Sequence, residues 1–83
     1  MMMTVTVQLF ARAADLAGGN RVELTLDDAA TVAELRAALV AARPGLGPIA
    51  GQLLVAVGQA YARDGDAVRP GVEIACFPPV SGG

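Results

Sequence analysis

One segment of this 83-residue chain has the pattern of a multi-turn helix, and segments that alternate like strands flank it on both sides. Thr31-Val32-Ala33-Glu34 matches a capping box, in which the hydroxyl of Thr31 accepts from the backbone N–H of Glu34 and the Glu34 carboxylate accepts from the N–H of Thr31. Arg43-Pro44-Gly45 ends the predicted helix, because a basic residue suits the negative end of the helix dipole and proline blocks continuation. Between these signals, apolar residues recur at helical spacing: Val32, Leu35, Ala38, Leu39 and Ala42.

Two segments before the helix alternate between apolar and polar residues, which is typical of half-buried strands. In residues 4–10 the apolar side is formed by Val5, Val7 and Leu9, and the aromatic Phe10 falls on the otherwise polar side. In residues 21–26 the apolar side is formed by Val22, Leu24 and Leu26. A short helical turn over 12–16 and the turn residues Gly18-Gly19-Asn20 separate the two strands, so we expect a hairpin.

Three more extended segments are predicted after the helix. Residues 46–51 are expected to form a loop or short turn, and the continuous apolar run over 52–57 indicates a strand that is buried on both faces near the sheet centre. A short extended piece at 58–62 and a last strand at 72–77 follow, separated by turn residues. Runs of strands with one helix packed on one sheet face make an α+β fold.

The composition excludes several kinds of site and partner. The chain has no histidine and no lysine, its arginines are scattered and its net charge is −2, so we expect no nucleic-acid surface. Without histidine, the single cysteine cannot belong to a Cys–His pair or a typical zinc site. We interpret Cys76 as a small buried hydrophobic residue. With no apolar run of about 20 residues and no basic leader, we expect a cytoplasmic protein with no membrane partner.

The end of the sequence, Pro78-Pro79-Val80-Ser81-Gly82-Gly83, offers the one reactive group that we identify. Because the sequence ends at Gly83, we expect a free α-carboxylate at the tip of a slim tail. Glycine has no Cβ, so such a tail can enter a narrow channel. The two prolines restrict φ and lack backbone donors, which prevents the tail from simply continuing a strand. We therefore expect a folded domain over 1–77 and a flexible tail over 78–83.

The order of these elements, together with several motifs, resembles the small, sulfur-carrier subunits of molybdopterin synthase, which have a ubiquitin-like β-grasp fold. The resemblance extends from Val5 to Gly83. It is carried by Leu9-Phe10-Ala11-Arg12, Thr31-Val32-Ala33-Glu34-Leu35, Leu54-Val55-Ala56-Val57-Gly58-Gln59 and Phe77-Pro78-Pro79-Val80-Ser81-Gly82-Gly83. The last motif is the most specific, since sulfur carriers for thiamine share Gly-Gly but usually lack Pro-Pro-Val-Ser.

The resemblance implies that Gly83 is the reacting residue. An E1-like adenylating enzyme would use MgATP to form an acyl-adenylate on Gly83, and sulfide from a persulfide donor would displace AMP to leave a thiocarboxylate. The large subunit of molybdopterin synthase would then take in the tail, in a heterotetramer of two small and two large subunits. The sulfur would build half of the dithiolene that holds molybdenum. The chain itself would bind no cofactor or metal and would act as a non-catalytic, sulfur-donating subunit.

Two elements are expected to contact the partner. The tail would insert through Pro78, Pro79, Val80, Ser81 and Gly82, and an apolar sheet surface would dock through Phe10, Tyr61 and Phe77, because aromatic residues are enriched in interface cores. The competing interpretation is that these aromatic residues cover a second small core.

Three other functions stay open at this point. The chain could carry sulfur for thiamine or another thiolated metabolite. It could be a ubiquitin-like protein modifier whose Gly83 forms isopeptide bonds with lysines of other proteins. It could also be a plain β-grasp binding module whose glycines only end a tail.

Overall fold

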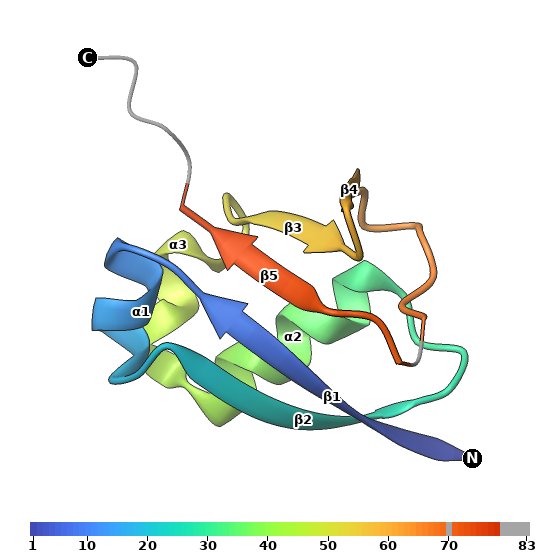
Figure 1. Ribbon diagram of the computed structural model, residues 1–83. Coiled ribbons are helices and arrows are strands. Elements are labelled where there is room, and N and C mark those ends of the chain that lie inside the picture. The colour runs from blue at the N-terminus through green and yellow to red at the C-terminus, as the bar shows by residue number, and fades with distance from the viewer. Residues whose placement is uncertain (70, 79–83) are drawn as a thin grey trace.

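Five strands form one mixed sheet, and the helices lie on one of its faces in the computed structural model, which describes residues 1–69 and 71–78 (Figure 1). The strands are β1 (Met2–Leu9), β2 (Arg21–Asp27), β3 (Leu54–Val57), β4 (Ala60–Ala62) and β5 (Ile74–Phe77). The helices are α1 (Arg12–Ala17), α2 (Val32–Ala42) and α3 (Gly47–Ala50), with a 3-10 turn, η1 (Pro44–Leu46), between the last two. None of the helices in this described part is long and apolar enough to cross a membrane.

The strand order β2-β1-β5-β3-β4 places the first and last of these strands side by side in the middle of the sheet. Strand β1 pairs antiparallel with β2, which confirms the predicted hairpin, and parallel with β5. Strand β3 pairs antiparallel with both β5 and β4. The prediction that residues 52–57 lie at the sheet centre and are buried on both faces is therefore wrong. The central strand is β5, and Leu54 in β3 is 43% exposed.

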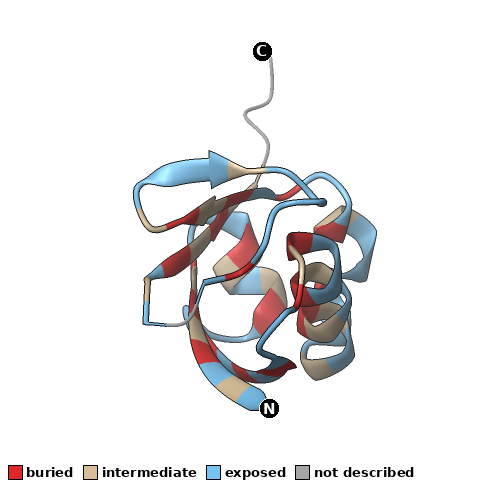
Figure 2. Cartoon of the chain, turned by 90° about the vertical axis from the view of Figure 1, so that its right-hand side faces the viewer, coloured by how far each residue is buried: buried red, intermediate tan, exposed pale blue. Residues whose placement is uncertain are grey.

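The core lies between the sheet and the helices, and the alternation of the strands decides which residues enter it (Figure 2). The predicted inward residues of the first two strands are all buried, as are three of the five residues of the helix stripe: Val5, Val7, Leu9, Val22, Leu24, Leu26, Val32, Leu35 and Leu39. The other two residues of the stripe, Ala38 and Ala42, are partly buried against the same core. Full burial of an aliphatic side chain of this size contributes about 1.5–3 kcal/mol. The fold therefore depends chiefly on two matching patterns, of period two in the strands and of period 3.6 in α2.

Helix α2 begins and ends where the sequence predicts. The oxygen Oγ1 of Thr31 accepts from the N–H of Glu34 at 3.4 Å, and the N–H of Thr31 donates to Oε1 of Glu34 at 3.1 Å. Both halves of the capping box are thus present. The helix ends at Ala42, and Pro44 starts a new turn.

Within the predicted loop or short turn over 46–51, residues 47–50 form one helical turn, α3. Leu46 and Ala50 are both buried, so packing against the core stabilises helical turns that local sequence alone does not favour. Pro48 lies in the first turn of α3, where its missing N–H removes no helical hydrogen bond.

The side chain of Arg36 connects α2 to the segments that follow it. Its Nη1 donates to the carbonyl oxygens of Ala50 and Leu53, both at 2.7 Å, and its Nε and Nη2 donate to Oδ1 of Asp64 at 3.1 and 3.0 Å. The Ala50 carbonyl ends α3 and has no partner within that helix. Charge-assisted bonds of this kind are stronger than neutral ones. Arg36 therefore fixes the position of α3 and the start of β3 against α2.

We predict that Gly45→Ala destabilises the protein by about 1–3 kcal/mol, the usual cost of forcing atoms into a packed site. A Cβ at Gly45 would collide with the carbonyl oxygen of Leu16, where η1 approaches the end of α1. Gly47→Ala is the matched control, since no heavy atom lies within 4 Å of its added Cβ. Urea unfolding of both variants tests this. Equal stability of the Gly45→Ala variant and the parent chain would contradict the close contact between Gly45 and the carbonyl oxygen of Leu16.

Candidate functional site: an aromatic docking surface

The sheet face opposite the helices, here called the open face, carries the outward side chains of all five strands. On β1 these are Thr4, Thr6 and Gln8, which alternate with buried residues. Cross-strand pairing then places side chains in rows across this face. One row runs from Arg21 through Gln8, Ala75 and Ala56 to Tyr61. The row is polar at the β2 side and apolar at the β4 side.

The three aromatic residues singled out from the sequence meet on the open face. The rings of Phe10 and Phe77 stack with centroids 4.8 Å apart and planes 10° from parallel. Tyr61 meets Phe77 edge to face at 6.5 Å. Phe10 is 41% exposed and Tyr61 is 72% exposed. Such exposure does not suit a closed second core, whereas a contiguous exposed aromatic group is typical of an interaction surface.

The backbone after β1 holds Phe10 in this position. The N–H of Phe10 donates to the carbonyl of Cys76 at 3.3 Å, which continues the pairing of β1 with β5. The next residue, Ala11, has φ of 54°, a conformation that is costly for any residue other than glycine. The chain turns there, and the N–H of Ala13 closes the turn by donating to the carbonyl of Phe10. Phe10 thus stays on the open face while α1 descends to the helix layer.

Leu54 belongs to the same surface, and sequence reasoning missed it. It is the direct cross-strand partner of Phe77, and 43% of it is exposed. The signal was present, because Leu54 and Ala56 alternate with the buried Val55 and Val57. The continuous apolar run concealed that alternation, since every position in it could be a core residue. We use the term aromatic surface below for Phe10, Leu54, Tyr61 and Phe77.

The expected tail begins beside the aromatic surface. Pro78 directly follows β5 and is half-buried. The other tail residues of the sequence prediction, including the reacting glycine, lie outside the described residues: Pro79, Val80, Ser81, Gly82 and Gly83. The structure therefore places the end of β5 and Pro78 beside the aromatic surface. The tail over 78–83 and its insertion role stay predictions.

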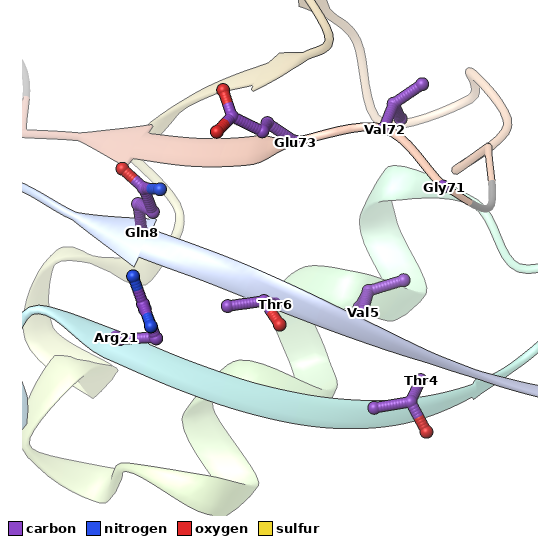
Figure 3. Close-up of a pocket in the computed structure, with 8 residues that line it drawn as sticks. All are labelled: Thr4, Val5, Thr6, Gln8, Arg21, Gly71, Val72 and Glu73. Atoms are coloured by element: carbon purple, nitrogen blue, oxygen red, sulfur yellow. The ribbon is translucent and has the colours of Figure 1, made fainter.

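A shallow depression of about 380 Å³ lies at the polar side of the open face (Figure 3). Gln8 lies between Arg21 and Glu73 there, so a positive and a negative side chain border the same space. The opposite charges leave no net positive potential for a phosphate group. Within residues 1–69 and 71–78, no three metal-binding side chains cluster.

Cys76 lies under the aromatic surface, on the inner side of β5. It is 1% exposed, which confirms the prediction of a buried residue. Burial raises the pKa of its thiol to about 11, because the low-dielectric interior disfavours the thiolate, and the charge of Arg36 offsets this in part. A thiol with that pKa remains protonated at neutral pH and is not a nucleophile. The only cysteine of the chain is thus structural.

A mixed five-stranded sheet with one long helix across one face and an exposed opposite face is the architecture of a ubiquitin-like β-grasp domain. The solved structures agree. The crystal structure of SAMP1 from Haloferax volcanii matches with a TM-score of 0.84 and 35% identity, over 96% of this chain and 99% of that one. A Caldiarchaeum subterraneum ubiquitin shares the fold, with a TM-score of 0.68 and 16% identity over the whole of both chains.

The chain belongs to the ThiS family, whose model matches residues 7–83. It is 36% identical to the molybdopterin synthase sulfur carrier subunit of Chlamydomonas reinhardtii, over 98% of this chain and 100% of that protein. It is also 38% identical to small archaeal modifier protein 1 of Haloferax volcanii, over 92% and 97% of the two chains. The resemblance to sulfur carriers noted in the sequence is thereby confirmed at the level of the family.

We predict that Cys76 makes the protein less stable at alkaline pH. The folding stability that depends on a protonated Cys76 thiol is fully present below the ordinary thiol pKa of 9.0 and is lost as the pH rises through about 11. The reason is that the thiol ionises at a lower pH in the unfolded chain than in the folded protein. At pH 11 the loss amounts to about 2 kcal/mol. Denaturant unfolding of the parent chain and of the Cys76→Ala variant, each at pH 8 and pH 11, isolates this term. A parent chain with no steeper decline than the variant would contradict the buried, protonated thiol.

Proposed function

We propose that this chain is a sulfur-carrier subunit of molybdopterin synthase and that the α-carboxylate of Gly83 becomes its thiocarboxylate. One observation carries the proposal: β5 ends beside an exposed aromatic stack, so the segment that leads to Gly82 and Gly83 starts from a surface suited to docking. Full-length similarity to a molybdopterin synthase sulfur carrier subunit supports the same function.

Activation of Gly83 must come from a partner. A carboxylate with a reference pKa of about 3.3–3.7 is ionised at neutral pH and is a poor electrophile. In the proposed sequence, an E1-like enzyme uses MgATP, a Gly83 oxygen attacks the α-phosphorus and pyrophosphate leaves. Sulfide sulfur then attacks the acyl carbon, and AMP departs with the bridging oxygen. The product is a thiocarboxylate in which sulfur replaces one carboxylate oxygen.

The thiocarboxylate would serve as the nucleophile in the second partner. In the proposed heterotetramer, each of two large subunits takes the tail of one small subunit, and the sulfur attacks the pterin precursor. The contribution of this chain is position: docking turns the encounter between sulfur and substrate into a step within one complex. We propose that the tail, Pro78, Pro79, Val80, Ser81 and Gly82, lies in a channel of the partner.

The aromatic surface is proposed to provide most of the docking energy. Exposed aromatic side chains supply large contact areas at low conformational cost, and a few such residues dominate typical interfaces. Because both partners must receive Gly83 in an active site, we propose that they use the same surface in turn. The loaded carrier would therefore have to leave the adenylating enzyme before it donates sulfur.

A second candidate function is supported by the similarity to small archaeal modifier protein 1. In that role the acyl-adenylate of Gly83 would be passed on to lysine amines of other proteins, forming isopeptide bonds. The chain has no lysine of its own, so it could not extend into chains on itself. Both candidate functions share the adenylation step. They differ in the acceptor: a sulfur carrier would pass its sulfur to the pterin precursor, whereas a modifier would pass its acyl group to a lysine amine.

We predict that incubation with an E1-like enzyme, MgATP and a sulfur source raises the intact mass by the replacement of one oxygen with sulfur. The mass change should disappear when Gly83 is deleted, because the terminal carboxylate then belongs to Gly82 and lies one residue short of the proposed reacting position. A competent enzyme that produces no mass change would refute the carrier proposal. Protein-sized adducts that resist reduction and map to lysines would instead favour the modifier.

We predict that Phe10→Ala and Tyr61→Ala each weaken binding to the large synthase subunit by about 30-fold or more, as expected for aromatic residues at interface centres. Thr4→Ala, on the same open face but at the far end of β1, is the control and should bind as the parent does. Calorimetric titration measures the affinities, and thermal unfolding verifies that each variant is folded. Unchanged binding of both aromatic variants would place docking elsewhere.

A further inference from the structure

Strand β2 forms one edge of the sheet, and it is long and regular. All seven of its residues pair with β1 without a bulge, from Arg21 opposite Gln8 to Asp27 opposite Met2. The other edge strand, β4, has only three residues. Short edge strands and bulges are ways in which proteins prevent edge-to-edge association. The β4 edge has such protection and the β2 edge does not.

The backbone groups that β2 presents at its free edge follow from two hydrogen bonds at the ends of the pairing. The N–H of Leu9 donates to the carbonyl of Asn20 at 2.8 Å, and the N–H of Asp28 donates to the carbonyl of Met1 at 2.9 Å. In an antiparallel pair, alternate residues bond to the neighbouring strand. The even-numbered residues of β2 therefore bond to β1, and the odd-numbered ones direct their N–H and C=O groups outward. All of these odd-numbered residues are exposed: Arg21, Glu23, Thr25 and Asp27.

The composition of β2 also leaves the edge open. Residues 21–27 contain no proline, glycine or lysine, and no inward-pointing charge interrupts Val22, Leu24 and Leu26. Arg21 and Asp27 form no ion pair with any other residue in the described part of the chain. The Arg21 guanidinium and the second carboxylate oxygen of Asp27 are therefore available to a neighbour that pairs along this edge, while Oδ1 of Asp27 accepts from the N–H of Ala29.

We infer that the neighbour is a second copy of this chain, paired antiparallel with β2 about a two-fold axis at Leu24. This register places Arg21 of each copy opposite Asp27 of the other, and Glu23 opposite Thr25. Opposite charges that face each other across a strand pair are favourable. The outward N–H and C=O groups of the odd-numbered residues then bond to each other, although the C=O of Asp27 also accepts from the N–H of Ala30 at 2.9 Å. The two sheets become one continuous sheet with both helix layers on the same side.

The charges also reject the competing registers. A slip of two residues, the smallest that keeps outward backbone groups opposite one another, places Glu23 opposite Glu23 in one direction and opposite Asp27 in the other. Like charges that are directly opposite destabilise the pair. A slip of one residue would move every inward side chain to the wrong face. The pattern of charges along β2 thus disfavours both two-residue slips. A slip of four residues would place Arg21 opposite Glu23, but only residues 21–23 of each strand would then overlap.

This interface is separate from the aromatic surface and does not rest on the proposed function. Phe10, Tyr61 and Phe77 come from the other strands and their ends, so a paired copy leaves them exposed. Stable interfaces bury about 1,200–2,000 Å², more than one strand pair provides. We therefore expect a reversible dimer at protein concentrations on the order of 100 µM, as typical of interfaces below that size.

Charge reversal tests the register. Arg21→Asp and Asp27→Arg should each weaken self-association about tenfold, because both cross-strand charge pairs become repulsive. An equal mixture of the two variants should associate about as well as the parent chain. In the mixed dimer the introduced aspartate of one copy faces the introduced arginine of the other, and the unchanged Asp27 faces the unchanged Arg21. Sedimentation equilibrium measures each association constant. Thermal unfolding checks folding, particularly for Asp27→Arg, which loses the bond from the Ala29 N–H.

Thr25→Pro tests the edge independently of charge. It removes an outward N–H that makes no bond to β1, so the monomer should stay folded while the dimer is lost. Tyr61→Ala is the control and should dimerise normally. The inference is overturned if the parent chain stays monomeric up to about 1 mM, well above the range expected for a weak interface. It is equally overturned if the mixture fails to restore association, or if Tyr61→Ala abolishes it while Thr25→Pro does not.

Discussion

The parallel pairing of β1 with β5 is the contact on which the rest of the structure depends. It joins residues that are far apart in sequence, with Val7 opposite Ile74 and Leu9 opposite Cys76. A parallel pair requires a long crossover, and here the crossover includes α2, which covers the buried side of the same strands. The pairing therefore creates the central strands of the sheet and the space that the core fills. It also places Phe10 next to Phe77 at the end of the sheet where the tail begins.

The middle of the chain is held in place by polar groups whose bonds are satisfied. The capping box starts α2 without leaving its first donors unpaired, and Arg36 binds the carbonyls at the end of α3 and before β3. Among the described residues, no buried side-chain nitrogen or oxygen lacks a partner. This satisfied, well-packed body suits a protein whose proposed chemistry occurs beyond its folded part, because the body has to present a tail and need not change shape itself.

In the proposed function, the chemistry and the recognition are divided between different parts of the molecule. The only thiol is buried and protonated, so no cysteine of the folded body would compete for Gly83 if a partner activated it. The family includes relatives named as sulfur carriers and a relative named as a protein modifier, on one fold. Since the fold is common to both, the proposed outcome for Gly83 would depend on which partner docks on the open face. The aromatic surface and the β2 edge are separate, so partner docking and pairing of two copies need not exclude each other.

Much of the local structure could be predicted because its causes are local. Alternation placed Val5, Val7 and Leu9 in the core and Phe10 on the other side, and the capping box and Arg43-Pro44 bounded α2 correctly. The tertiary structure decided the strand order, the central place of β5, the exposure of Leu54 and the helical form of 47–50. Those features depend on which distant segments pair and on what space remains after they pack, and no local pattern encodes that. The sequence by itself thus determined which side of each early strand is apolar and where the one long helix runs. Only the folded chain brought Phe10, Tyr61 and Phe77 together, because contacts between distant strands, and not spacing along the sequence, place them on one surface.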